Sequence, residues 1–114
     1  MSEKIYTIDE IKSLLNEIFY NFNIKKAILF GSYAKQTPTS KSDIDIVVDS
    51  DGKLLNINFY GLLEEIVQKL QKNIDLFEIT EIQKIVIYII IYKRRELLFM
   101  KSKDRIIIQK LLFI

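Results

Sequence analysis

The sequence lacks cysteine, histidine and tryptophan altogether, and it has one proline and three glycines among 114 residues. The absence of cysteine excludes disulfide bonds and thiolate metal sites. The absence of histidine removes the most common general base and the most common transition-metal ligand. Any acid–base chemistry must therefore come from carboxylates, lysines or tyrosines.

Charge and hydropathy set further limits. Lysine and arginine (17) slightly outnumber aspartate and glutamate (15), and the net charge of +2 is too small to indicate nucleic-acid binding. About half of the residues (49%) are apolar, and the length suits one domain over residues 1–114. Residues 1–4 show no secretory pattern, and the longest apolar run, 85–92, is too short for a membrane span of about 20 residues. We therefore expect a cytoplasmic domain with no membrane segment and no direct nucleic-acid contact.

Hydrophobic periodicity predicts a mixed order of helices and strands. Thr7 and Glu10 have the spacing of a capping box. Apolar residues then recur at helical spacing, at Ile8, Ile11, Leu14, Leu15, Ile18, Phe19 and Phe22. Residues 58–72 predict a second helix, whose apolar face consists of Phe59, Leu62, Leu63, Ile66, Val67 and Leu70. Short strands are predicted at residues 26–30 and 43–48 and around Asp75.

Two aspartates separated by one residue form the first candidate site. Residues 43–48 read Asp-Ile-Asp-Ile-Val-Val, and side chains two apart in a strand point to the same face. Asp43 and Asp45 would therefore project together, while the intervening apolar side chains enter the core. Such close carboxylates repel each other unless a cation lies between them, and magnesium is usually held by one or two carboxylates plus substrate phosphates. The pair predicts a metal site that a bound nucleotide completes.

A glycine–serine pair precedes these aspartates by ten residues. Gly31 would end the first strand and let the backbone approach a ligand closely. Ser32 offers a hydroxyl group, and the residues after it could begin a short helix whose N-terminus would bind an anion. Lys35 and Lys41 flank the threonine- and serine-rich loop and could neutralise phosphate charge. This segment is therefore a candidate phosphate-binding loop.

The strand, the glycine–serine pair, the ten-residue gap and the aspartate pair resemble the nucleotidyltransferase superfamily that includes DNA polymerase β. The resemblance is strongest to its minimal prokaryotic members, the MNT-type (MntA-like) domains, and it extends from the first helix to about residue 100. In such domains a third aspartate lies on a later strand, where this chain has Asp75. Their loops often carry a basic residue followed by glycine, where this chain has Lys35 and Gln36.

The resemblance implies a polymerase-β-like nucleotidyltransferase fold of the α/β (α+β) class, with helices flanking a small mixed sheet. It implies that two Mg²⁺ ions are held by Asp43, Asp45 and Asp75, with ATP as the nucleotide. Asp75 would bind the second ion or accept the proton of an attacking hydroxyl group. The nucleotide-binding residues would be Gly31, Ser32, Lys35 and Ser42.

The acceptor also follows from the resemblance. Minimal MNT domains are antitoxins paired with HEPN-domain ribonuclease toxins, and they transfer AMP to a tyrosine of the toxin. The resemblance therefore implies a protein adenylyltransferase that acts as an antitoxin with a HEPN partner. Two alternatives remain open: an enzyme that modifies a small molecule such as an aminoglycoside, and a non-catalytic antitoxin that only binds. The presence of all three acidic positions argues against the non-catalytic alternative.

Two apolar segments near the C-terminal end predict an interface. Propensity favours a strand for residues 85–92, whereas the resemblance implies a helix there and an edge strand near residues 97–100. We expect the helix. A helix that is apolar on all sides must be buried on all sides, and residues 106–114 are apolar as well. We therefore expect self-association or a helical partner protein.

Overall fold

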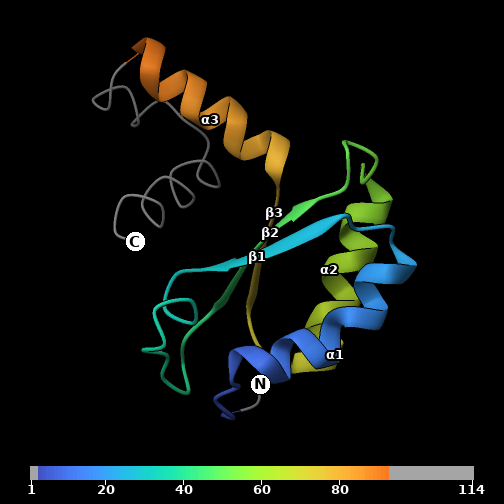
Figure 1. The fold of residues 1–114 in the computed structure, drawn as a ribbon, viewed down its shortest axis with the longest axis vertical. Helices are drawn as coiled ribbons and strands as arrows, with labels where there is room; N and C mark the ends of the chain where they lie inside the picture. The colour runs from blue at the N-terminus through green and yellow to red at the C-terminus, as the bar shows by residue number, and fades with distance from the viewer. Residues whose placement is uncertain (1–2, 93–114) are drawn as a thin grey trace.

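The computed structural model describes residues 3–92 and arranges them as three helices and a three-stranded sheet (Figure 1). The elements in chain order are α1 (Ile8–Asn21), β1 (Lys26–Phe30), β2 (Ile44–Asp49), α2 (Ile57–Leu70), β3 (Ile74–Glu78) and α3 (Ile79–Tyr92). The predicted class, helices flanking a small mixed sheet, is confirmed. The edge strand expected near residues 97–100 and the apolar segment 106–114 lie outside the described residues.

Local hydrogen bonds and backbone conformation set the start of α1 and the end of α2. At the start of α1, the Thr7 backbone N–H donates to Glu10 Oε1 at 3.0 Å, and the Glu10 N–H donates to Thr7 Oγ1 at 3.1 Å, so the capping box is confirmed. Helix α2 ends two residues before the predicted boundary. Gln71 adopts a left-handed conformation (φ +54°) and donates its N–H to the Val67 carbonyl at 2.8 Å, which terminates the helix.

Strand β2 is the centre of the sheet. It pairs antiparallel with β1 and parallel with β3, and helix α2 lies in the connection between the two parallel strands. The antiparallel pairing places the end of β1 beside the start of β2, with Phe30 opposite Asp45. Residues 31–43 join these two strands, so the predicted phosphate-binding loop lies at this end of the sheet.

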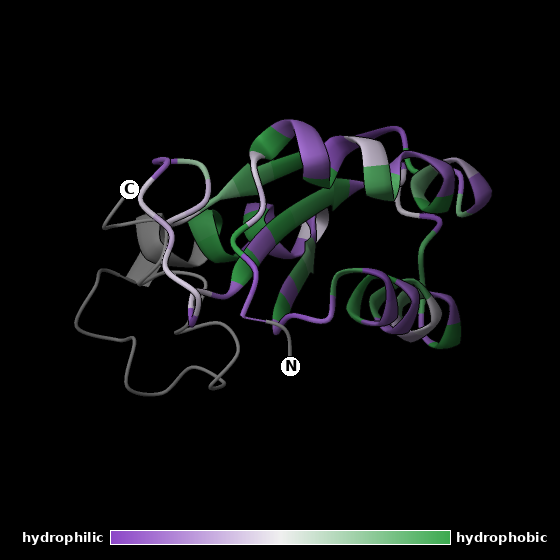
Figure 2. Ribbon diagram, turned by 90° about the horizontal axis from the view of Figure 1, so that it is seen from below, coloured by the Kyte–Doolittle hydropathy of each residue, from purple (hydrophilic) through white to green (hydrophobic). Residues whose placement is uncertain are grey.

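The two faces of the sheet are covered by different helices, with α1 and α2 on one side and α3 on the other (Figure 1). The residues of β2 alternate between them, as the sequence pattern predicts. Ile44, Ile46 and Val48 are at most 2% exposed and pack with α1 and α2. The cluster under α3 consists of Phe30, Val47, Phe77 and Ile85. In Figure 2 the strands are mostly hydrophobic, whereas the helices show both colours, as expected for a sheet buried between amphipathic helices.

The helix expected at residues 85–92 is confirmed, as part of α3. Ile85 is 3% exposed and packs on the sheet, but Val86 and Ile87 are 43% and 55% exposed. The helix therefore has apolar side chains on its outer side, and the interface remains a prediction. No helix within residues 3–92 is long and apolar enough to cross a membrane.

A buried hydrogen-bonded pair closes the end of the sheet opposite the loop. Ser50 follows β2 and is 2% exposed, and Glu78 ends β3 and is 5% exposed. The Ser50 hydroxyl group donates to Glu78 Oε2 at 2.7 Å and accepts the Leu54 N–H at 3.0 Å. One hydroxyl group thus satisfies a buried carboxylate oxygen and a buried backbone donor.

Replacing Ser50 with alanine should lower the free energy of unfolding by about 1–3 kcal/mol, because it leaves two buried polar groups without a partner. Urea denaturation of the Ser50→Ala variant measures this loss. A free energy of unfolding within about 0.5 kcal/mol of the unmodified protein, the range typical of ordinary surface changes, would show that the pair is dispensable.

Candidate active site

Two of the predicted aspartates lie side by side on neighbouring strands. Asp45 on β2 and Asp75 on β3 are register partners in the parallel pair. Neighbouring strands are about 4.8 Å apart, and register partners project from the same face of the sheet. Asp45 is 5% exposed and Asp75 is partly buried. A carboxylate buried to this degree requires nearby donors or cations to offset its loss of hydration.

The chemical character of this face follows from the alternation of side chains. Val47 and Phe77 lie two residues beyond Asp45 and Asp75 on their strands and belong to the apolar cluster under α3. Phe30, opposite Asp45, joins the same cluster, and its ring centroid is 6.0 Å from that of Phe77. The two carboxylates therefore lie at the end of the apolar cluster under α3, where electrostatic interactions between charges are stronger than in open water.

Gly31 lies against Asp45. A Cβ atom added to Gly31 would overlap Asp45 Oδ2, and it would lie 3.2 Å from Asp45 Cγ. Gly31 also has φ +74°, in the left-handed region that favours glycine. We expected glycine at this position so that the backbone could approach a ligand. The structure gives it a further reason, because the Asp45 carboxylate occupies the space that a side chain would need.

The prediction of a short helix beginning at Ser32 is wrong. Residues 31–36 form turns, with the Lys35 N–H bonded to the Gly31 carbonyl at 3.2 Å and the Thr37 N–H bonded to the Ser32 carbonyl at 3.0 Å. The segment is bounded by two left-handed residues, Gly31 and Gln36 (φ +60°), which prevents a helix from continuing. Gln36 stands where related loops often carry glycine, and its positive φ is the conformation that glycine adopts most easily. The anion site at a helix N-terminus therefore has no basis here.

Asp43 lies directly before β2, which begins one residue later than predicted, at Ile44. The Ile44 N–H donates to the Asn73 carbonyl at 3.0 Å, so this point of the chain is held beside the start of β3. Within residues 3–92, no three acidic side chains lie close enough together to surround a metal ion. The structure brings Asp45 on β2 together with Asp75 on β3. Asp43 lies directly before β2, one residue outside the strand.

The remaining predicted residues belong to the loop itself. The Ser42 hydroxyl group accepts the Thr39 N–H at 2.8 Å, and the Ser42 N–H donates to the Thr39 carbonyl at 3.1 Å. Ser42 therefore stabilises a tight turn at residues 39–42. Lys35 is exposed, and Ser32 is partly buried.

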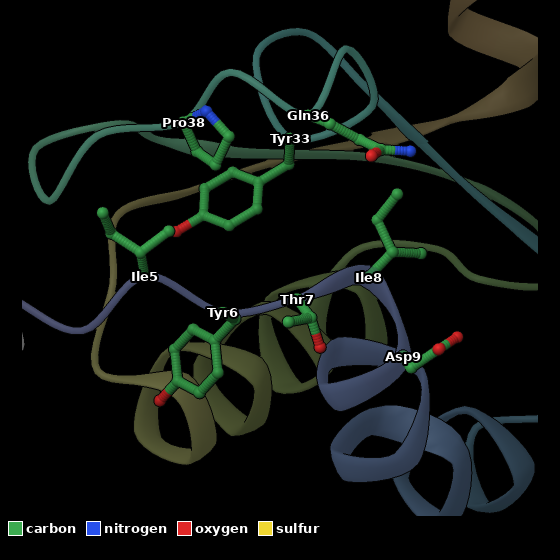
Figure 3. A pocket seen from close by; sticks show the side chains of 8 residues that line it. All are labelled: Ile5, Tyr6, Thr7, Ile8, Asp9, Tyr33, Gln36 and Pro38. Carbon is green, nitrogen blue, oxygen red and sulfur yellow. The ribbon is translucent and has the colours of Figure 1, made fainter.

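Tyr33 is a buried residue of the loop to which the sequence analysis gave no role. It is 1% exposed, and its ring points toward Ile5 in the segment before α1 (Figure 3). There it lines a pocket of about 570 Å³, formed by Ile5, Tyr6, Thr7, Ile8, Asp9, Tyr33, Gln36 and Pro38. Burial raises the pKa of the Tyr33 phenol above its ordinary value. None of the predicted site residues lines this pocket, and Tyr33 serves to anchor the loop on the body of the protein.

The family model described as "Polymerase beta, Nucleotidyltransferase" matches residues 10–104. Three relatives, each named "Putative protein adenylyltransferase", come from Methanocaldococcus jannaschii. The first is 37% identical over 70 residues, which cover 60% of this chain and 74% of the relative. The second is 37% identical over 78 residues (59% and 80%), and the third is 31% identical over 80 residues (67% and 93%). No solved structure gives a significant match.

The family match extends over most of the chain and includes the glycine–serine loop and all three aspartates. The fold agrees with it, since a small mixed sheet carries the loop between its first two strands and an aspartate on each of the two parallel strands. This chain therefore belongs to the polymerase beta nucleotidyltransferase family.

Proposed function

We propose that this chain is a magnesium-dependent enzyme that transfers AMP from ATP to a hydroxyl group of a protein. The observation that carries the proposal is the pairing of Asp45 with Asp75, with Gly31 packed against Asp45. Two carboxylates held side by side at the end of a buried sheet, next to a glycine–serine loop, suit a nucleotide that arrives with its metal ions.

The donor set fits magnesium. Asp43, Asp45 and Asp75 offer only hard oxygen ligands, which Mg²⁺ prefers. Magnesium at nucleotide sites takes one or two protein carboxylates and completes its shell with phosphate oxygens and water. A pair of adjacent carboxylates is therefore a sufficient protein contribution. Bound magnesium would supply charge stabilisation on the triphosphate and at the attacking and leaving oxygens.

The chain's own residues would bind and orient the reactants. The backbone at Gly31 and the Ser32 hydroxyl group would hold the β- and γ-phosphates, and Asp43 and Asp45 would hold the metal ions that accompany the triphosphate. In the reaction the acceptor oxygen forms a bond to the α-phosphorus, the bond from that phosphorus to the bridging oxygen breaks, and pyrophosphate leaves. Asp75, the register partner of Asp45, would hold the second ion or take the proton of the acceptor hydroxyl group. Catalysis of this kind rests on positioning and electrostatics.

A protein acceptor is favoured by the three relatives described above, each of which is named "Putative protein adenylyltransferase". We propose the more specific acceptor as a tyrosine of a cognate HEPN-domain ribonuclease, which AMP transfer would inactivate, with this chain as the antitoxin. The exposed apolar side chains of α3, Val86 and Ile87, are consistent with contact to such a partner. A small-molecule acceptor such as an aminoglycoside is the alternative.

Intact-mass measurement separates these acceptors. The purified chain is incubated with Mg·ATP and, in parallel reactions, with a HEPN-domain protein encoded beside it and with aminoglycosides. We expect the mass of the protein partner to increase by one or more AMP units, and replacement of the modified tyrosine by phenylalanine to abolish the increase. Modification of an aminoglycoside alone would refute the protein acceptor. Inhibition of the partner without any change of mass would favour a binding antitoxin.

A further inference from the structure

A buried lysine beside the candidate active site has no role in the reaction described so far. Lys72 is 2% exposed, although lysine is almost never fully buried unless it is paired. Its ammonium group donates to the Ser40 carbonyl at 2.8 Å, across 32 residues of sequence. The burial of this charge is costly, and its hydrogen bond goes to the loop that joins β1 to β2.

At this point the loop forms a turn with hydrogen bonds of its own. The turn at residues 39–42 closes on itself through Thr39 and Ser42. Lys72 lies outside the loop, and its side chain is bonded to Ser40 within this turn. The turn leads into Asp43, so the position of Asp43 depends on how the turn is anchored.

The other end of Lys72 is fixed by regular structure. It lies between Gln71, which ends α2, and Asn73, whose carbonyl accepts the Ile44 N–H at 3.0 Å. Strand β3 begins at Ile74 and places Asp75 opposite Asp45. One short segment therefore holds Asp75 in the sheet and, through Lys72, holds the turn that precedes Asp43.

We propose that Lys72 is a positioning residue for the metal–nucleotide site. By tying Ser40 to the start of β3, it sets the direction in which the chain enters β2, and with it the position of Asp43 relative to Asp75. This inference rests on the proposed function for its catalytic consequence, but the anchoring itself does not depend on it.

The test compares Lys72→Met, which removes the donor, with Lys72→Arg, which restores one. In the nucleotide-free protein, we expect Lys72→Met to speed hydrogen exchange at the amides of residues 41–44 by about tenfold or more, the effect of losing one charge-assisted hydrogen bond. Calorimetry should show weaker Mg·ATP binding that excess Mg²⁺ partly restores. In the transfer reaction, kcat should fall by about tenfold, and Lys72→Arg should recover much of each property.

Ser50→Ala is the matched control, because it should destabilise the protein at the opposite end of the sheet without touching the loop. It should leave the exchange rates at residues 41–44 and the Mg·ATP affinity unchanged under conditions where the protein stays folded. If Lys72→Met does not fold, Lys72→Gln, which keeps a polar but shorter and uncharged end, serves in its place.

Unchanged local exchange in Lys72→Met (or in Lys72→Gln where it takes its place), or loosened exchange with unaltered Mg·ATP binding, would overturn the proposal. The same change in Ser50→Ala would also overturn it, since the effect would then reflect general stability. An unmodified protein that binds Mg·ATP but transfers AMP to no acceptor would refute the proposed function alone, because exchange and binding still report on Lys72.

Discussion

Replacing Asp45 with asparagine is expected to reduce AMP transfer by about a thousandfold or more while the protein stays folded. Stabilisation of the triphosphate charge by bound metal is worth several kcal/mol, and each 1.4 kcal/mol corresponds to about tenfold in rate. Asp45 is buried beside its register partner Asp75, and asparagine preserves the shape while it removes one of two neighbouring negative charges. Initial rates at saturating Mg·ATP, together with a thermal melt of each variant, measure the effect.

Asp49→Asn provides a matched control on the same strand. Asp49 ends β2 four residues after Asp45, on the same side of the strand, and its carboxylate accepts the Asp51 N–H at 3.0 Å. Asparagine can accept that hydrogen bond through its own oxygen, so activity and stability should change little. Comparable losses of activity in both variants would mean that the general charge of the strand matters and that Asp45 has no special role.

Replacing Gly31 with alanine is expected to lower activity by about a hundredfold, more than its loss of stability explains. Alanine at φ +74° pays the cost of a left-handed conformation, about 1–2 kcal/mol. Its Cβ atom would also overlap Asp45 Oδ2, so the carboxylate must move. A displacement of about 1 Å of a catalytic group can cost about a hundredfold in rate.

Gly52→Ala separates these two effects. Gly52 has nearly the same backbone angle, φ +73°, but a Cβ atom added there meets nothing within 4 Å. Both variants should therefore pay the same backbone cost in urea denaturation, Gly31→Ala should lose further stability through the displaced carboxylate, and only Gly31→Ala should lose activity and Mg·ATP affinity. Equal activity in the two variants would show that the contact between Gly31 and Asp45 has no part in the reaction.

Much of the fold could be predicted because it depends on local patterns. The capping box of Thr7 and Glu10 and the alternation of Ile44, Ile46 and Val48 are properties of neighbouring residues, and the structure reproduces them. The helix α3 was expected against its strand propensity, because the family resemblance outweighed the β-branched residues of the segment.

The parts that could not be predicted depend on contacts between distant segments. The pairing of Asp45 with Asp75 is a matter of strand register, which spacing alone does not specify. The close approach of Gly31 to the Asp45 carboxylate arises because β1 and β2 pair antiparallel across the loop. Lys72 has no local signal either, since a lysine between helix and strand is ordinarily exposed.

The most direct test of the central claim follows the two ends of ATP separately. The unmodified protein and Asp45→Asn are incubated with Mg²⁺, the acceptor protein and ATP labelled on either the α- or the γ-phosphate. The account predicts that the α-label moves to the acceptor, that the γ-label leaves with pyrophosphate, and that both events require Mg²⁺ and Asp45. Transfer of the γ-label to the acceptor, or transfer of the α-label that persists in Asp45→Asn, would contradict it.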